Sequence, residues 1–308
     1  MTTQRYASPQ AVEAAIKTAA RKAHAAERSL SVAERIRLEY FDRFLSRIFD
    51  PAADERWVLK GGTSLLARVS SARSTTDIDL LRTDSSLEDA VAELRSLAEA
   101  EFEDHFRFQY TGHSAALEGT QQDYVEGCRV EFDVYIGASR KESLHVDLVV
   151  GAVITDETDL RLPAHTLSLE KLPSGNGYRL YPVTDQIADK VCATLSLYRG
   201  KPSSREKDLV DLVLLATTQQ IPGARLERAL TREAAARGLD LPEQFAVPRE
   251  WGPAYKKLAA SVPACREHLD IRSAEDVVRR LIDPAVARSV TGALWNPTGL
   301  MWVDSPSH

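Results

Sequence analysis

The chain has 308 residues, of which 44% are hydrophobic and 27% charged, and its formal net charge at pH 7 is −6. This composition excludes a wholly disordered or collagen-like chain, and the length allows two domains. No apolar run reaches the length that a membrane span needs, so we expect no membrane partner. Because a protein with a broad nucleic-acid interface is usually basic, any contact with nucleic acid has to be local and small. The three cysteines are widely spaced, which is typical of a protein of the reducing cytoplasm.

The N-terminal region predicts two helices between residues 9 and 50. The second begins at Ser31, which is followed three residues later by Glu34, and this spacing is a capping-box pattern. The large apolar residues of that helix fall on one stripe, which consists of Phe41, Phe44, Leu45 and Ile48. We therefore expect this helix to pack on a core through the stripe.

Residues 57–151 alternate between strand and helix signals. We expect strands at 57–59, around Ile78, at 105–112, 128–136 and 143–150, and helices at 63–69 and 86–101. Prolines and glycines make 152–183 irregular or extended. The pattern is then helical over 184–198, 203–218, 224–237, 252–260 and 273–290, and the last residues, with two tryptophans, should pack back on the body. These elements predict an α+β fold, in which a mixed sheet flanked by helices (residues 1–183) precedes a C-terminal helical bundle (residues 184–308).

The strongest functional signal lies between residues 57 and 81. Alternate side chains of a strand share a face, so Asp77 and Asp79 should point the same way while Ile78 and Leu80 enter the core. Two carboxylates this close raise each other's pKa unless a cation neutralises them. Mg²⁺ is suited to that role because it binds carboxylate oxygens together with substrate phosphates, and Mn²⁺ is an alternative. An Asp-x-Asp string alone is more often the solvated edge of a strand, so its surroundings decide.

A tight turn, Gly61-Gly62, separates an apolar strand from a helix-sized stretch that starts with Thr63 and Ser64. The backbone N–H groups at the start of a helix bind phosphate oxygens well. The turn is therefore a candidate cradle for the phosphates of a nucleotide.

A third acid, Asp147, lies in the expected strand at 143–150, where Leu144, Val146 and Leu148 share the opposite, apolar face. An acid inside such a strand is costly unless it has a partner, although an exposed sheet face is an equal alternative for Asp147 alone. We expect Asp77, Asp79 and Asp147 to bind the metal. His145 should be a neighbour and not a ligand, because Mg²⁺ prefers oxygen.

The Gly-Gly turn, the Asp-x-Asp strand and the later lone acid resemble the nucleotidyltransferases of the DNA polymerase beta superfamily. The string VLKGGTSLLARVSSARSTTDIDLL is similar to the first motif of the AbiEii family of bacterial toxins, which includes the MenT nucleotidyltransferases. Its later motifs, a helix with a lysine and then a (K/R)-D-x-x-D-L helix, resemble PVTDQIADKVCATLSLYRGKPSSREKDLVDLVLL. The resemblance spans roughly residues 30–220. It implies a nucleotidyltransferase-type sheet core whose active site the helical C-terminal domain completes.

By this resemblance, Lys190 is a catalytic or phosphate-contacting lysine, and Asp211 is an essential acid with Asp208 beside it in the motif. Asp208 and Asp211 are three residues apart and so share a helix face. The residues alone leave simpler alternatives open. Lys190 could be a surface lysine whose stem covers apolar surface, and the two acids could stabilise a helix N-terminus.

Together these residues predict a Mg²⁺-dependent nucleotidyltransferase. Asp77 and Asp79 would hold two Mg²⁺ ions, and Asp147 would bind the second one and help to deprotonate the attacking hydroxyl. The metals would stabilise the entering and leaving oxygens at the α-phosphate. The expected contacts to the nucleoside triphosphate are Gly61, Gly62, Thr63, Ser64, Arg73, Lys190 and Asp208.

The resemblance to MenT-like toxins also implies an acceptor and a partner. The acceptor would be the 3′ end of tRNA, extended from CTP or UTP so that translation is blocked, and no DNA partner is expected. A separately encoded antitoxin would restrain the protein within a toxin–antitoxin or phage-defence system. Two alternatives remain open. One is a nucleotidyltransferase that adenylylates a protein or small molecule, which the acidic net charge favours, and the other is a non-enzymatic nucleotide-binding regulator.

Overall fold

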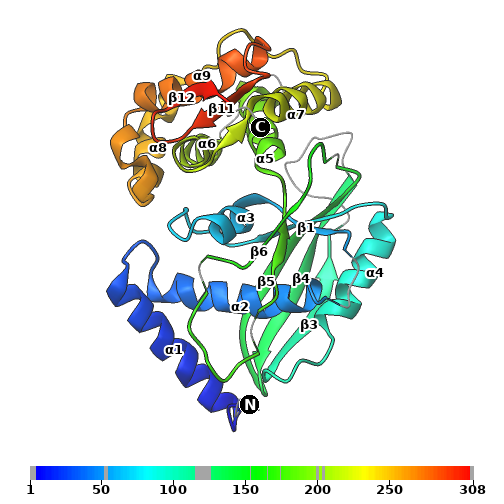
Figure 1. Cartoon of the computed structure of the whole chain (residues 1–308). Coiled ribbons are helices and arrows are strands. Elements are labelled where there is room, and N and C mark those ends of the chain that lie inside the picture. Colours follow the sequence, from blue (N-terminus) through cyan, green and yellow to red (C-terminus); the bar gives the residue numbers. More distant parts are fainter. Residues whose placement is uncertain are drawn as a thin grey trace.

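The computed structural model describes residues 5–51, 55–114, 126–152, 154–164, 166–173, 175–198, 201–202 and 205–305. Figure 1 shows two parts: the sheet and the N-terminal helices form the lower part, and a group of helices forms the upper part. The chain passes from the lower part to the upper part at Pro182, directly after the strand Tyr178–Leu180 and before the helix Val183–Leu195. The α+β fold with a mixed sheet flanked by helices is confirmed.

Within the described ranges, seven strands form one mixed sheet in the order β3-β4-β5-β2-β1-β7-β6. Its strands are β1 (Trp57–Leu59), β2 (Ile78–Arg82), β3 (Phe106–His113), β4 (Glu126–Ile136), β5 (Ser139–Val150), β6 (Asp159–Arg161) and β7 (Tyr178–Leu180). β2 pairs with β5 and β1 with β7 in parallel, and the other neighbours are antiparallel. The parallel pairing of β2 and β5 brings the two acidic strands side by side. β6 and β7 lie in the segment expected to be irregular or extended.

One face of this sheet is apolar because alternate residues of β2, β4 and β5 are buried. The helices of the lower part are α1 (Pro9–Ala26), α2 (Val32–Ile48), α3 (Gly61–Arg68) and α4 (Leu87–Ala98). The predicted capping box at the start of α2 is confirmed, since Ser31 and Glu34 exchange backbone and side-chain bonds. The predicted stripe is buried, and its Phe44 meets Phe108 and Phe132 of the sheet edge to face.

The upper part consists mainly of α5 (Val183–Leu195), α6 (Glu206–Thr218), α7 (Gly223–Ala236), α8 (Gly252–Ala259) and α9 (Ile271–Val286). Short 3₁₀ turns occur at Arg249–Trp251 and Pro263–His268. The expected helices are all present, with ends that differ by a few residues, and residues 203–204 of the second lie outside the described ranges. α5 packs against α6 and α7, and α6 packs against α8 and α9. α6 is therefore the central helix of this part.

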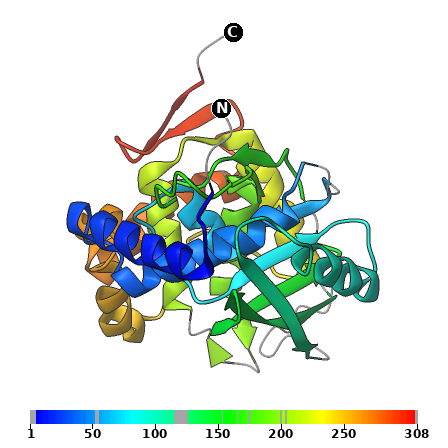
Figure 2. The same cartoon turned by 90° about the horizontal axis from the view of Figure 1, so that it is seen from below.

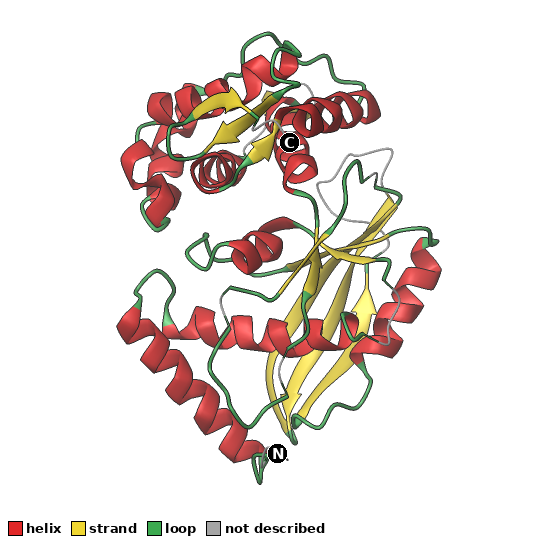
Figure 3. Cartoon of the chain, viewed as in Figure 1, coloured by secondary structure: helices red, strands yellow, loops and turns green. Residues whose placement is uncertain are grey.

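Strands among these helices were not expected. In the part of the chain that the structure describes, β10 (Ile221–Pro222), β11 (Ala293–Asn296) and β12 (Met301–Asp304) form a small antiparallel sheet, and β8 (Leu197–Tyr198) pairs with β9 (Lys201–Pro202). Figure 3 shows these strands among the helices, and Figure 2 shows the β11–β12 hairpin at the margin of the molecule. Trp295 is fully buried and its indole donates to the carbonyl of Ala216 at 2.7 Å. The final segment therefore packs back on the body, but as a hairpin.

Candidate active site

The two acidic strands bring Asp79 and Asp147 directly opposite each other. β2 and β5 run parallel with Asp79 in register with Asp147, and Asp77 immediately precedes β2. Ile78 and Leu80 are fully buried on the other face, as the alternation predicts. The three carboxylates therefore gather on one polar face of the sheet.

The pKa of Asp79 shows that the cluster disfavours negative charge on this carboxylate. Burial, followed by the charge of Asp147, raises the pKa of Asp79 to about 6, while Lys190 and Lys60 oppose the shift. At neutral pH the carboxylate is thus ionised in an environment that penalises its charge. Such a group attracts a cation.

The cation that the structure places at this cluster is the side chain of Arg129 in β4. Its Nε and Nη2 donate to the two oxygens of Asp147 at 2.7 and 2.9 Å, and Nη2 lies 3.9 Å from Asp77 Oδ2. His145 Nδ1 is 3.7 Å from Asp77 Oδ1, so it is a neighbour of the acids. Among the described residues, no group of three or more His, Cys, Asp or Glu side chains is arranged to hold a metal ion. The oxygen donors nevertheless suit Mg²⁺ chemically, and the guanidinium stands in for a cation beside them.

The Gly61-Gly62 turn starts α3 beside Asp79. Gly61 has φ +59°, and a Cβ at this position would overlap the Asp79 carboxylate. Only glycine satisfies both conditions without strain. The first N–H groups of a helix have no partner within the helix, so the start of α3 offers donors close to the carboxylates.

The side chains of Thr63 and Ser64 are fully buried. Thr63 Oγ1 donates to the backbone carbonyl of Asp77 at 3.0 Å, which ties α3 to the start of β2. The Ser64 hydroxyl is buried without a hydrogen-bond partner among the described residues. These two hydroxyls therefore belong to the packing of α3.

Lys190 of α5 faces Asp208 and Asp211 of α6. Its Nζ donates to Asp208 Oδ1 at 2.9 Å and to Asp211 Oδ2 at 2.7 Å. Arg73, from the loop between α3 and β2, donates to both oxygens of Asp211 at 2.9 and 2.8 Å. Lys190 is therefore not a surface lysine. Asp208 and Asp211 bind its ammonium, so their role is not limited to stabilising the N-terminus of α6. This four-residue ion network is the second half of the candidate site.

The pKa shifts of Lys190, Arg73 and Asp208 favour the charged form of each group. Burial alone would lower the pKa of Lys190, but the charges of Asp208 and Asp211 raise it above its usual range. Burial alone would raise the pKa of Asp208, but Lys190 and Arg205 lower it. Asp211 is fully buried and accepts hydrogen bonds from both Lys190 and Arg73, so it holds these two cations in position.

Along the chain, the Gly-Gly turn, the carboxylate pair and the lysine–aspartate helix pair follow one another in the order of the motifs quoted from the sequence. Residues 43–288 match the family described as nucleotidyl transferase AbiEii toxin, Type IV TA system. The chain belongs to this family. At its C-terminal end the AbiEii match extends beyond the resemblance visible in the sequence and includes most of the upper part. The protein is thus a nucleotidyltransferase toxin of a type IV toxin–antitoxin system, a class that implies a separately encoded antitoxin.

This AbiEii protein is similar to several solved structures. MenT4, a nucleotidyltransferase toxin from Mycobacterium tuberculosis H37Rv, is 17% identical with a TM-score of 0.50, covering 83% of this chain and 93% of its own. A putative nucleotidyltransferase from Helicobacter pylori is 16% identical (TM-score 0.42; 84% of this chain, 98% of its own). JHP933, also from Helicobacter pylori, is 15% identical (TM-score 0.43; 84% and 95%). The likeness to MenT4 concerns the fold alone. No curated protein matches the chain.

Two residues of the AbiEii site were missed in the sequence. Arg129 lies on the polar face of an alternating strand, but its place opposite Asp147 depends on the β4–β5 register. Lys60 precedes the Gly-Gly turn, and its ammonium lies 4.5 Å from the ring centre of Tyr181. Its position next to the turn was a usable signal, since a cation there lies near the Asp79 carboxylate and opposes the rise of its pKa.

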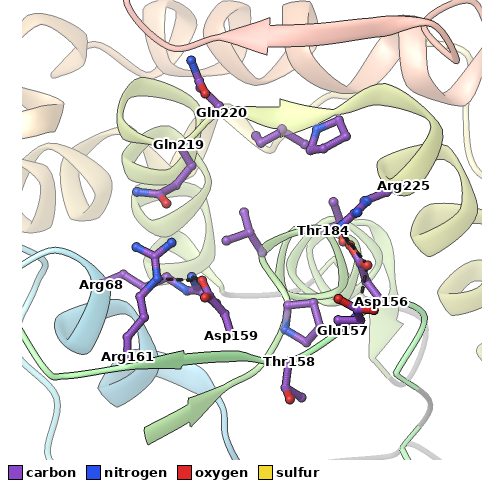
Figure 4. Close-up of a pocket in the computed structure, with 14 residues that line it drawn as sticks. Arg68, Asp156, Glu157, Thr158, Asp159, Arg161, Thr184, Gln219, Gln220 and Arg225 are labelled. Atoms are coloured by element: carbon purple, nitrogen blue, oxygen red, sulfur yellow. Dashed lines mark hydrogen bonds and ion pairs between the residues drawn. The ribbon is translucent and has the colours of Figure 1, made fainter. Parts of the chain in front are cut away.

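A separate cavity of about 280 Å³ lies where the chain passes from β7 to α5 (Figure 4). Arg68, Asp159 and Arg161 line it from the sheet part, and Gln219 and Arg225 line it from the helical part. It shares no residue with the carboxylate cluster or the ion network.

Within the described residues, no helix is both long and apolar enough to cross a membrane.

Proposed function

We propose that this protein transfers a nucleoside monophosphate from a nucleoside triphosphate to RNA, and that its acceptor is the 3′ end of tRNA. Family membership supports the nucleotidyl transfer. The observation that carries the proposal is the in-register pair of Asp79 and Asp147 beside the Gly61-Gly62 turn. Carboxylates and helix N–H groups meet there, which is what a metal-bound triphosphate requires.

Asp77, Asp79 and Asp147 would hold the divalent cation, Mg²⁺ or Mn²⁺. The bound metal would supply charge stabilisation for the entering and leaving oxygens. The backbone at the start of α3 would bind the triphosphate, with Lys190 and Arg73 as nearby positive charges. Asp147 would accept the proton of the acceptor hydroxyl, whose oxygen bonds to the α-phosphorus as pyrophosphate leaves with the electrons of the broken bond.

The resemblance to MenT-like toxins supports the choice of tRNA and of CTP or UTP as donor. Addition to the 3′ end would prevent aminoacylation and so stop translation in the cytoplasm. The antitoxin of the type IV pair would relieve this block. The net charge of −6 is the observation that favours the competing acceptor, a protein or small molecule.

The test is incubation of the purified protein with Mg²⁺, each of the four α-labelled nucleoside triphosphates, and total tRNA. Asp79→Asn removes one charge of the carboxylate pair with little change of shape. Asp133→Asn is the matched control, because Asp133 is on the same sheet but pairs with Arg140 outside the site.

We expect wild type and Asp133→Asn to label tRNA with a pyrimidine nucleotide, and Asp79→Asn to lose the label. Label on protein instead of RNA would show that the acceptor is a protein, and the proposal of nucleotidyl transfer would still hold. If triphosphate binds without any transfer, the protein is the non-enzymatic regulator that the sequence left open.

A further inference from the structure

Arg129, Asp147 and Asp79 form one row across three adjacent strands. Arg129 of β4 is in register with Asp147 of β5, and Asp147 is in register with Asp79 of β2. A row of this kind places side chains on the same face about 5 Å apart, strand to strand. The guanidinium is thus built into the carboxylate cluster by the sheet itself.

Arg129 occupies both oxygens of Asp147 in a fork of two hydrogen bonds, at 2.7 and 2.9 Å. Such charge-assisted pairs are strong for their size and fix the orientation of the carboxylate. The same guanidinium is 3.9 Å from Asp77, so it is the positive charge for two of the three acids. A divalent cation bound between these acids would meet that charge at close range.

The fork is also accessible enough to open. The side chain of Arg129 is 42% exposed and that of Asp147 is 23% exposed, whereas Asp211 in the ion network is fully buried. An exposed ion pair of this type contributes about 1 kcal/mol or less, because water and salt screen it. An ion with two charges can therefore displace it.

We propose that Arg129 is an internal cation that neutralises Asp147 in the metal-free protein and competes with the divalent metal for that carboxylate. The inference rests on the proposed function in one respect, namely that the carboxylates hold a metal. Arg129 is then a positioning residue, which acts on the reaction through Asp147. It sets how tightly the metal binds before the triphosphate arrives.

Mn²⁺ alone is the probe, because the electron paramagnetic resonance signal of the free ion gives its dissociation constant directly. Arg129→Gln removes the charge and the fork. Arg140→Gln is the matched control: Arg140 makes the same two-bond fork to Asp133 between the same two strands, at 2.7 and 2.8 Å. It lies seven residues from Asp147 along β5, roughly 23 Å away by the strand rise.

We expect Arg129→Gln to bind Mn²⁺ about fivefold more tightly than wild type, and Arg140→Gln to bind as wild type does. Thermal unfolding should show the complementary effect: without metal Arg129→Gln is less stable than wild type, and Mn²⁺ raises its Tm by more. Should the glutamine variant fail to fold, Arg129→Lys, which cannot form the fork, provides the same comparison with a smaller gain.

Equal or weaker Mn²⁺ binding by Arg129→Gln overturns the competition while leaving the transferase proposal intact. Absence of Mn²⁺ binding in all variants overturns the competition too, and it removes the metal from the proposed function as well. The two failures are therefore distinguishable.

Discussion

The ammonium of Lys190 donates to Asp211 at 2.7 Å, and Asp211 is fully buried at that contact. Arg73 holds the other side of the same carboxylate. A single buried acid thus sets the positions of two cations, one from the helical part and one from the loop before β2. Substitution of Asp211 should therefore affect both stability and activity, whereas substitution of an acid that contacts only the substrate should affect activity alone.

Asp211→Asn should destabilise the protein by about 3 kcal/mol, because it leaves two buried cations without their shared charge. Nucleotidyl transfer should fall with it. Urea unfolding measures the first effect and labelled transfer the second. Asp133→Asn, which breaks a more exposed pair, should cost less than about 1 kcal/mol. An inactive Asp211→Asn of unchanged stability would instead mean that Asp211 contacts the reacting atoms.

Gly61→Ala should abolish transfer, since the added methyl would overlap the Asp79 carboxylate. Gly238→Ala is the matched control: its φ is +57°, close to the +59° of Gly61, but nothing lies within 4 Å of its Cβ position. Backbone strain alone should cost each variant about 1 kcal/mol, and only Gly61→Ala should lose more. Chemical denaturation and transfer assays on both variants separate strain from collision. Equal losses in the two variants would contradict this account.

The stability contributed by Asp208 should depend on pH. Burial alone would raise its pKa, but Lys190 and Arg205 lower it below the ordinary 3.8. A lowered pKa means that the ionised group stabilises the fold above that value, and that the contribution is lost as the pH falls through the folded pKa. Asp208→Asn should therefore lower the free energy of unfolding by about 2 kcal/mol at neutral pH.

Urea titrations from neutral pH to below pH 3.8 measure this difference. The gap between wild type and Asp208→Asn should narrow only at the acid end. A gap that stays constant over the whole range would show that the charge of Asp208 is not its source.

Trp295→Phe should cost about 2 kcal/mol, because it leaves the buried carbonyl of Ala216 without its donor and opens a cavity in the core. Trp302→Phe is the control on the same hairpin. The Trp302 indole donates to the backbone carbonyl of Arg280 at 3.1 Å in an exposed setting, so its loss should cost less than about 1 kcal/mol. Thermal unfolding of the two variants checks whether the hairpin is anchored through Trp295.

The strand periodicity of the sequence predicted which residues face the core and which face the polar side of the sheet. The structure confirms this for Ile78, Asp79 and Asp147. Periodicity describes one strand at a time. The register that pairs Asp79 with Asp147 and Asp147 with Arg129 arises from contacts between distant segments, which no local pattern contains. The grouping of the carboxylates could therefore be predicted from the sequence, and the position of Arg129 beside them could not.

The helical half shows the same limit. Helices long enough to repeat their apolar face several times were predicted from the sequence, and their predicted ends differ from the observed ends by a few residues. β11 and β12 have four residues each, too few for alternation to stand out, and their pairing is fixed by Trp295 packing on α6. The expected helix at 273–290 accordingly stops at Val286, and the chain turns into the hairpin.

The ion pair between Arg73 and Asp211 joins two segments that are synthesised at different times. The carboxylates and the Gly-Gly turn leave the ribosome first, whereas Lys190 and Asp211 follow only with α5 and α6. An unfinished chain thus holds its acids without the lysine that belongs beside them. A chain that ends before α6 (Glu206–Thr218) therefore carries the carboxylates and the Gly-Gly turn but cannot form the ion network.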